Sequence, residues 1–288
     1  MKDKIGLLIN PQKPKALEIG KRLLLWGAEK GVSFLAPPHE AAVLGIPGAE
    51  DEDWKEQVRF AVVLGGDGTF LRAARYVLGN DIPLYGINVG RLGFLASGDP
   101  NQAEKDIETI LEGRFFTQRR HLLKGTVFRK DAMVHEVYAL NDLVVTKGAF
   151  ARVITLEISV GQRPLSLMTG DGLILSTPTG STGYALSAGG PIIPPHVHCM
   201  LLVPICAHTL YARPMVFGED DLIRIIPRGD HRDMMLTQDG QLGYELLPGD
   251  QICASLAKEK SVSIILLPDR DYYDLLLEKF QWGQNVIE

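Results

Sequence analysis

An apolar run that ends in a glycine-rich turn constrains this chain more than any other feature. Residues 61–64 read Ala-Val-Val-Leu, residues 65–69 read Gly-Gly-Asp-Gly-Thr, and residues 70–75 read Phe-Leu-Arg-Ala-Ala-Arg. The pattern predicts a buried strand, a tight turn and the start of a helix, an arrangement that presents backbone N–H groups to a phosphate. Asp67 has a glycine on each side, so its carboxylate is open to a ligand and able to accept a proton. The turn therefore points to phosphoryl transfer.

This turn matches neither of the two common phosphate loops. The chain contains no G-x-x-x-x-G-K-[ST] run, and a dinucleotide fingerprint needs a third glycine where Leu71 stands. A structural alternative stays open, in which Asp67 or Thr69 caps the helix and the glycines supply positive φ angles.

Composition narrows the function classes. The chain has 288 residues, 45% of them hydrophobic, which fits a soluble protein of two domains. A net charge of −5 argues against a general binder of nucleic acid or of anionic membranes. The three cysteines have no C-x-x-C spacing, which is typical of reduced thiols. The first apolar run is too short for a signal peptide, and no apolar stretch is long enough to span a membrane. We therefore expect a cytoplasmic protein.

Two domains of different architecture are expected. In residues 1–115 strands and helices alternate, which predicts an α/β domain with a parallel sheet. Residues 116–261 contain short segments of β-branched and apolar residues broken by glycine and proline, which predicts a mostly β domain. Residues 262–288, a strand and an amphipathic helix, are expected to return to the first domain.

The elements of the first domain follow from periodicity. We expect strands at residues 4–9, 32–35, 59–64 and 83–88 and helices at residues 15–30, 70–78 and 101–111. Residues 37–53 are rich in proline, glycine and acidic residues and are expected to form a surface loop.

A second glycine-rich run occupies residues 171–191. An apolar strand ends in a cluster of five hydroxyl residues with glycines, and residues 182–188 are expected to form a short helix. The hydroxyls, free N–H groups and Tyr184 would suit a ribose, a phosphate and a stacked base. The alternative is a Ser/Thr-rich loop whose hydroxyls only cap the helix.

Smaller candidates also have structural alternatives. Asn141-Asp142 opens an apolar run, so it marks either a bend or edge, such as an Asx turn, or a pair that holds a ligand. The sequence Asp-Gly-Gln at residues 239–241 lies between two expected strands, and the preferred interpretation is a type I′ hairpin turn. Arg72 and Arg152 are candidate phosphate contacts, although most arginines are solvated surface groups.

Two further kinds of site are not supported. His196 and His198 have no other ligands at zinc-site spacing, and no protein-held metal is expected. The serines lack a G-x-S-x-G elbow, which argues against a serine hydrolase.

Three stretches together resemble the NAD kinase family: residues 65–69, Asn141-Asp142 and residues 177–184. The first is shared with diacylglycerol and sphingosine kinases and with phosphofructokinases, whereas the second glycine-rich run, ending Leu-Ser-Ala-Gly-Gly-Pro, is more specific. Residues 212–214 and 239–241 are also similar to the family. The resemblance extends over residues 62–282.

The resemblance implies both fold and reaction. It implies a Rossmann-like α/β domain, similar to that of diacylglycerol kinases and phosphofructokinases, followed by a mostly β, NAD-binding domain, in a homodimer or homotetramer. The implied reaction transfers the terminal phosphoryl of ATP, or of polyphosphate, to the 2′-hydroxyl of the adenosine ribose of NAD, giving NADP. A divalent metal ion, Mg²⁺, is expected to be bound with ATP.

The implied site residues are carried over position by position. Asp67 corresponds to the proton acceptor, Asn141 and Asp142 to the pair at the ribose and adenine, and Asp171 to a residue near the nicotinamide. The expected nucleotide-binding positions are Gly68, Arg72, Asn141, Asp142, Arg152, Thr169, Asp171, Thr182, Gly183, Tyr184, Ala185, Leu186, Ser187 and Gln241.

Three positions depart from the family pattern. Asp142 stands where glutamate is usual, Gly183 where alanine is usual, and Ala207 where proline is usual. Asp142 is the departure expected to affect nucleotide affinity most, because its side chain is one methylene shorter.

Two other functions are alternatives to the NAD kinase. A lipid or sugar kinase of the same superfold would have an apolar or basic acceptor site, against which the hydroxyl-rich run argues. A non-catalytic NAD-binding protein would not need Asp67 intact in its turn.

Overall fold

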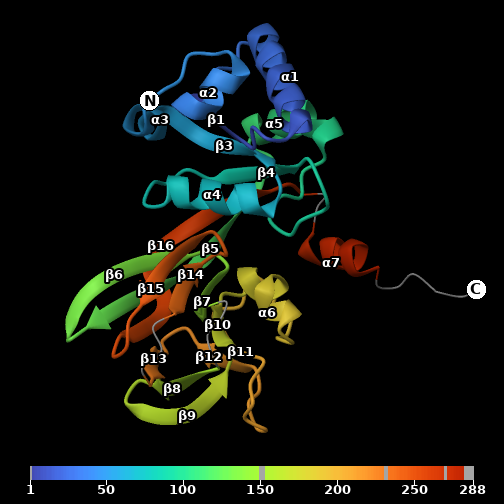
Figure 1. Cartoon of the computed structure of the whole chain (residues 1–288). Coiled ribbons are helices and arrows are strands. Elements are labelled where there is room, and N and C mark those ends of the chain that lie inside the picture. Colours follow the sequence, from blue (N-terminus) through green and yellow to red (C-terminus); the bar gives the residue numbers. More distant parts are fainter. Residues whose placement is uncertain (1, 149–152, 230–232, 269–270, 282–288) are drawn as a thin grey trace, which may run out of the picture. The chain divides into compact units, whose positions relative to one another are not determined.

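The computed structural model describes residues 2–148, 153–229, 233–268 and 271–281, which fall into two compact units (Figure 1). Unit 1 consists of the described residues of 1–119 and 262–288, and unit 2 of those of 120–261. Unit 1 combines helices with a parallel sheet and unit 2 is mostly β, which confirms the predicted fold class. None of the described helices is long and apolar enough to cross a membrane.

The sheet of unit 1 is parallel and has the strand order β2-β1-β3-β4. These strands are β1 (Lys4–Ile9), β2 (Phe34–Leu35), β3 (Val58–Gly65) and β4 (Leu84–Asn88). The strand beside β4 is the last part of β16 (Gln251–Leu266), where Ile264 pairs in parallel with Leu84. Unit 1 thus contains segments from both ends of the chain.

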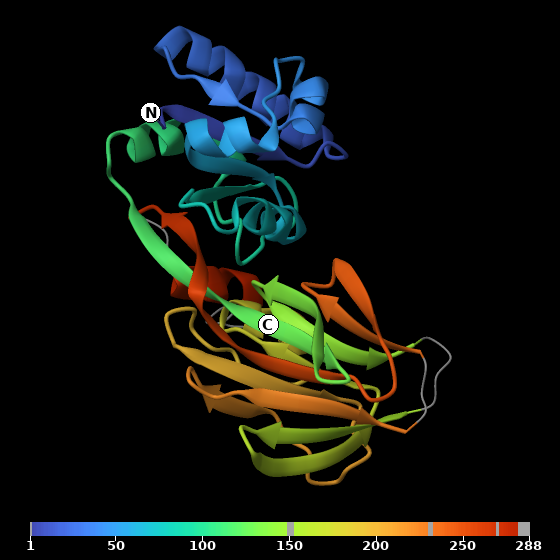
Figure 2. The ribbon, with the colours of Figure 1, turned by 90° about the vertical axis from the view of Figure 1, so that its left-hand side faces the viewer.

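Helices cover both faces of this sheet (Figure 2). These helices are α1 (Pro14–Lys30), α2 (Pro38–Leu44), α3 (Asp51–Gln57), α4 (Asp67–Val77) and α5 (Ala103–Leu111). A 3₁₀ turn, η1 (Pro100–Gln102), precedes α5, and a further helix, α7 (Tyr272–Phe280), follows β16. One face, which includes Leu7 and Val62, packs with α1, α2 and α5. On the other face Gly6 approaches Trp54 of α3, and Gly86 approaches Phe70 of α4. The loops that follow β1, β3 and β4 lie at the carboxyl ends of these parallel strands.

The prediction of a surface loop at residues 37–53 was wrong, because α2 and the start of α3 lie in this range. Pro38 stands at the start of α2, where its missing N–H costs nothing, and Gly45 ends the helix with φ of 72°. In α3, Trp54 is fully buried and its Nε1–H donates to the carbonyl of Leu35 at 2.9 Å. Helices of two turns are too short for a periodic pattern, so tertiary packing decides them.

Unit 2 is built from two packed antiparallel sheets. The first has the strand order β12-β11-β10-β7-β14-β15, and the second contains β13, β8 and β9 with β5, β6 and part of β16. The strands are β5 (Phe116–Arg129), β6 (Ala132–Ala139), β7 (Asp142–Lys147), β8 (Ile154–Val160), β9 (Arg163–Gly170), β10 (Gly172–Ser176), β11 (Cys199–Ile205), β12 (Met215–Gly218), β13 (Ile223–Arg228), β14 (Met234–Gln238) and β15 (Leu242–Leu246).

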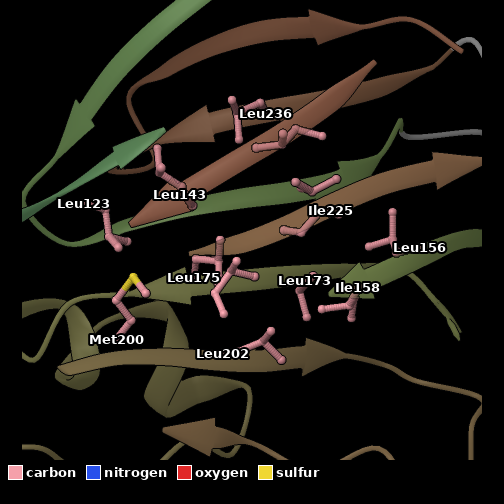
Figure 3. Packing of buried hydrophobic residues seen from close by; sticks show 14 of the residues in the cluster. Leu123, Leu143, Leu156, Ile158, Leu173, Leu175, Met200, Leu202, Ile225 and Leu236 are labelled. Atoms are coloured by element: carbon pink, nitrogen blue, oxygen red, sulfur yellow. The ribbon is translucent and has the colours of Figure 1, made fainter. Parts of the chain in front are cut away.

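The core of unit 2 lies between these sheets (Figure 3). Leu143 and Leu173 come from the first sheet, and Leu156 and Ile225 come from the second. The other face of the first sheet is covered by the second glycine-rich run, which folds into η2 (Thr179–Thr182) and α6 (Tyr184–Ser187), with Ala185 in a separate apolar cluster. The sheet therefore gives this run a rigid support.

Candidate functional site

The glycine-rich turn of unit 1 joins the carboxyl end of β3 to α4. A Cβ on Gly65 would lie 2.3 Å from Oγ1 of Thr69, so only glycine fits there. Gly66 is the N-cap, and its carbonyl accepts the N–H groups of Thr69 and Phe70, each at 3.0 Å. The N-cap position is Gly66, so neither Asp67 nor Thr69 is the N-cap residue that the structural alternative required.

The carboxylate of Asp67 is instead held by a loop that follows β4. Oδ2 accepts the N–H of Phe94 at 2.9 Å, and Oδ1 accepts those of Leu95 and Ala96 at 3.0 and 3.3 Å. A Cβ on Gly93 would lie 2.0 Å from Oδ1, so the absence of a side chain at Gly93 lets the loop approach. Hydrogen bonds from backbone N–H groups to a carboxylate are charge-assisted and fix its position. We call residues 93–96 the Asp67 cradle.

Sequence reasoning missed the Asp67 cradle. The available signal was the pair of glycines, Gly90 and Gly93, directly after the predicted strand at residues 83–88, since glycines after a strand allow close backbone approach. Nothing local indicates which carboxylate such a loop meets.

Arg72, proposed as a phosphate contact, is already engaged within unit 1. Its guanidinium forms an ion pair with the buried Glu40 at 2.8 Å and donates to the carbonyl of Ile9 at 2.6 Å. Gly68, by contrast, is exposed beside Asp67. A phosphate contact of Arg72 would have to compete with the Glu40 ion pair.

In unit 2, Asn141 and Asp142 lie where the chain bends from β6 into β7. The carboxylate of Asp239 accepts the N–H groups of Leu140, Asn141 and Asp142 at 3.3, 2.7 and 3.3 Å, so these three backbone N–H groups of the bend are paired. The predicted type I′ turn is confirmed, because Asp239 and Gly240 have φ of 51° and 61° and the N–H of Gln241 donates to the carbonyl of Gln238. The role of Asp239 in holding the bend was missed.

Asp142 is buried, and this changes its acidity. Burial, reinforced by the nearby charge of Asp239, raises the pKa of the Asp142 carboxyl to about 7. The side chain therefore changes between a hydrogen-bond donor and a pure acceptor near neutral pH.

We expect Asp142→Asn to stabilise unit 2 at alkaline pH. Because the folded-state pKa of Asp142 is raised from 3.8 to about 7, the free energy of unfolding falls as the pH rises from about 4 to about 7 and is constant above that. The neutral amide avoids this loss, so at pH 8 the variant gains on the order of 2–4 kcal/mol, with little gain at pH 4. Calorimetric Tm values at both pH values measure the difference. Asp220→Asn, an exposed position, is the control, and an equal gain at both pH values would contradict the assignment.

The second glycine-rich run packs tightly against this bend. A Cβ on Gly180 would lie 2.2 Å from the carbonyl oxygen of Asn141, and the Thr177 hydroxyl donates to the carbonyl of Leu140 at 2.6 Å. The buried Ser181 hydroxyl donates to the carbonyl of Pro178 and accepts the N–H of Ile193. These hydroxyls serve the loop itself, so the prediction that the hydroxyl cluster as a whole lines a pocket was too broad.

The remaining predicted positions divide by exposure. Tyr184 and Ser187 are exposed, Thr182, Gly183 and Leu186 are half-buried, and Ala185 is buried.

Four further predicted positions are Thr169, Asp171, Gln241 and Arg152. Asp171 is paired with Lys147 at 2.9 Å, and the hydroxyls of Thr169 and Thr155 are 3.1 Å apart. Gln241 is exposed in its hairpin, and Arg152 lies outside the described residues.

Metal-binding side chains do not gather in the described part of the chain, where no group of three or more His, Cys, Asp or Glu could hold an ion. His198 pairs with Glu219 at 3.2 Å and lies edge-on to His121.

Comparison with known proteins places both units in one family. The model of the ATP-NAD kinase N-terminal domain matches residues 48–115, and that of the ATP-NAD kinase C-terminal domain matches residues 140–266. The chain is 40% identical to an NAD kinase of Geotalea daltonii, over 98% of this chain and 99% of that protein. It is 38% identical to an NAD kinase of Heliobacterium modesticaldum, over 97% and 99%.

Two solved structures have the same fold. Yeast NADH kinase complexed with NADH aligns with a TM-score of 0.89 at 24% identity, covering 99% of this chain and 89% of that one. An NAD kinase from Archaeoglobus fulgidus in complex with ATP aligns with a TM-score of 0.76 at 24% identity, covering 96% and 98%. With both family models matched in order and close relatives over its full length, the chain belongs to the NAD kinase family of phosphotransferases.

Proposed function

We propose that this chain transfers the terminal phosphoryl of ATP to the 2′-hydroxyl of the adenosine ribose of NAD, with Asp67 as the general base. The observation that carries the proposal is the Asp67 carboxylate, fixed at the end of β3 by the amides of the Asp67 cradle in a chain of this family. A fixed carboxylate is suited to proton transfer because general-base catalysis needs a hydrogen bond of defined geometry.

Counting lone pairs indicates which oxygen of Asp67 accepts the proton. Each oxygen of an ionised carboxylate has two acceptor positions. Oδ1 accepts two backbone N–H groups, whereas Oδ2 accepts only that of Phe94. We therefore assign Oδ2 as the base. As the ribose 2′-oxygen forms its bond to the γ-phosphorus, its proton passes to Oδ2, and the bond from the γ-phosphorus to the β–γ bridging oxygen breaks so that ADP leaves with that electron pair.

The negative charge of the donor phosphates must be neutralised, and unit 1 can supply part of the positive potential. The first turn of α4 begins at the turn that carries Asp67, and helix N-termini favour anions. Magnesium prefers phosphate oxygens and water to dedicated protein cages, and no acidic cluster gathers in the described residues. We propose that Mg²⁺ arrives bound to ATP, where it screens the phosphate charge.

Unit 2 carries the residues that we propose for the adenosine of NAD. Oδ1 of Asn141 is buried without a hydrogen-bond partner among the described residues, and its Nδ2 is 3.7 Å from the position of a Cβ on Gly183. Buried polar atoms are rarely left unpaired, so a ligand N–H such as the adenine amino group would satisfy it. The exposed ring of Tyr184 offers a stacking surface, and Asp142 is suited to a ribose hydroxyl.

We also propose that the enzyme acts in the cytoplasm as a homodimer or homotetramer. The described cysteines are all free, as in reducing compartments. Leu165 and Leu167 on β9, at the edge of its sheet, are 41% and 61% exposed, which favours a covering partner.

A coupled assay tests the reaction. The protein is incubated with NAD, Mg²⁺ and either ATP or polyphosphate, and NADP is detected with a dehydrogenase that accepts only NADP. We expect NADP to accumulate with at least one donor. Absence of product with both donors would overturn the proposal and favour a non-catalytic NAD-binding protein, and phosphorylation of a lipid or sugar in place of NAD would favour the other rival.

A further inference from the structure

Lys13 lies in the loop between β1 and α1, before the stretches that resemble the NAD kinase family. Its backbone is fixed, because the N–H of Lys13 donates to the carbonyl of Asn10 at 3.1 Å and the N–H of Asn10 donates to the carbonyl of Leu64 at 2.9 Å. The loop is therefore anchored on the end of β3, next to the turn that carries Asp67.

The Lys13 ammonium lies close to two glycine-containing turns. A Cβ on Gly90 would be 2.8 Å from Nζ of Lys13, and a Cβ on Gly66 would be 3.8 Å from it. The Asn88 side chain folds the Gly90 turn, since its Oδ1 accepts the N–H of Gly90 and its Nδ2 donates to the carbonyl of Arg91, both at 2.7 Å. The absence of a side chain at Gly90 allows this approach of the ammonium, whereas a Cβ on Gly66 would be at an ordinary contact distance.

Lys13 is half-buried, and within the described residues no carboxylate forms an ion pair with it. A half-buried positive side chain with no carboxylate partner in this part of the structure is suited to pairing with a bound anion. Arg72, the other cation of this region, is already paired with Glu40. Lys13 is thus available to an anionic ligand where Arg72 is not.

The three loops concerned follow β1, β3 and β4, which are parallel neighbours in the sheet. In open α/β sheets, ligands bind outside the carboxyl ends of the strands. Lys13, Gly66 and Gly90 all lie at this edge, together with the N-terminus of α4. A positive side chain combined with a helix N-terminus is the arrangement by which proteins hold phosphate groups.

We propose that Lys13 binds the phosphates of the phosphoryl donor. The lysine that a Walker A loop carries within its own sequence would here be supplied by a different loop. This assignment rests on the proposed function. Lys13 is assigned to the phosphoryl donor and not to NAD, because Lys13 and the phosphate turn belong to unit 1, whereas the residues proposed to bind the adenosine of NAD belong to unit 2.

Steady-state kinetics of the full chain test the proposal. Lys13→Met is expected to raise the KM for ATP by about 10- to 100-fold, as for loss of a hydrogen bond to a charged group, and to leave the KM for NAD within about twofold. Lys13→Arg keeps the charge and should restore most of the affinity for ATP. Lys15→Met, exposed on the first turn of α1, is the matched control. An unchanged KM for ATP, or a rise only in the KM for NAD, would overturn the assignment.

A binding measurement separates this proposal from the reaction itself. Inorganic tripolyphosphate titrated calorimetrically should bind the wild type and Lys15→Met, and bind Lys13→Met at least about tenfold more weakly. If the wild type forms no NADP yet shows this difference, the function is wrong and the phosphate site stands. If the wild type forms NADP and all three proteins bind tripolyphosphate equally, the site is wrong and the function stands. Equal thermal unfolding temperatures exclude misfolding as the cause.

Discussion

Asp67→Asn is expected to lower kcat for NADP formation by at least about a hundredfold, which is the range that general-base catalysis contributes. The variant should keep its fold, because the amide oxygen still accepts the N–H groups of Leu95 and Ala96, and only the bond from Phe94 is lost. One such bond to a charged group is worth about 1.5–3 kcal/mol. The affinity for NAD should change little, since the residues proposed to bind it belong to unit 2.

The measurement is kcat by the coupled assay, with NAD affinity and Tm determined on the same samples. Asp81→Asn, an exposed acidic position of unit 1, is the control for the loss of one negative charge. Near-normal turnover of Asp67→Asn would falsify the role of Asp67 in proton transfer, even if the protein remained an NAD kinase.

Gly93→Ala is expected to reduce kcat by about 10- to 100-fold without touching a substrate. The added methyl group would lie 2.0 Å from Oδ1 and 2.6 Å from Cγ of Asp67, so the carboxylate or the Asp67 cradle must move. A displacement of about 1 Å at a reacting group costs on the order of a hundredfold in rate. The KM for NAD should stay within about threefold, because the change lies in unit 1.

A double-mutant cycle shows whether Gly93 acts through Asp67. In the Asp67→Asn background Gly93→Ala should have little further effect on the residual rate, because the group that it displaces is no longer a base. Gly218→Ala is the control, since its added methyl group would have its nearest neighbour, Oδ2 of Asp221, at an ordinary 3.6 Å. Multiplicative losses in the double variant would mean that Gly93 affects folding or another residue.

The sequence was sufficient where a local pattern determines the structure. The strand, glycine turn and helix around Asp67 form as expected, and α1 ends at Gly31, whose φ is 71°. The hairpin at Asp239 also forms as its dipeptide predicts. In these segments side-chain periodicity and the conformational freedom of glycine act over a few residues, so one sequence is enough to detect them.

The sequence was insufficient where distant segments meet. The amides that hold Asp67 are 27 to 29 residues away, and those that hold the Asp239 carboxylate are 97 to 99 residues away. In both cases the donors are backbone N–H groups, which every residue except proline has, so no side-chain pattern marks them. The raised pKa of Asp142 has the same origin, since burial and its neighbour Asp239 come from the tertiary fold.

The nucleotide-binding positions taken from the family resemblance remain predictions. The structure adds a physical reason to some of them, such as the unpaired Oδ1 of Asn141, and it shows competing partners for others, such as Arg72. Arg152 lies outside the described residues, so only substitution can test it.

The strand beside β4 has a consequence for the order in which the protein folds during synthesis. Unit 1 consists mainly of the first 119 residues, yet Ile264 supplies the neighbour of Leu84 in its sheet. During synthesis, the edge of β4 that later pairs with β16 therefore has no neighbouring strand until unit 2 has been made. Such edges invite pairing with other chains, so the emergence of the segment around Ile264 ends the period of greatest risk of aggregation.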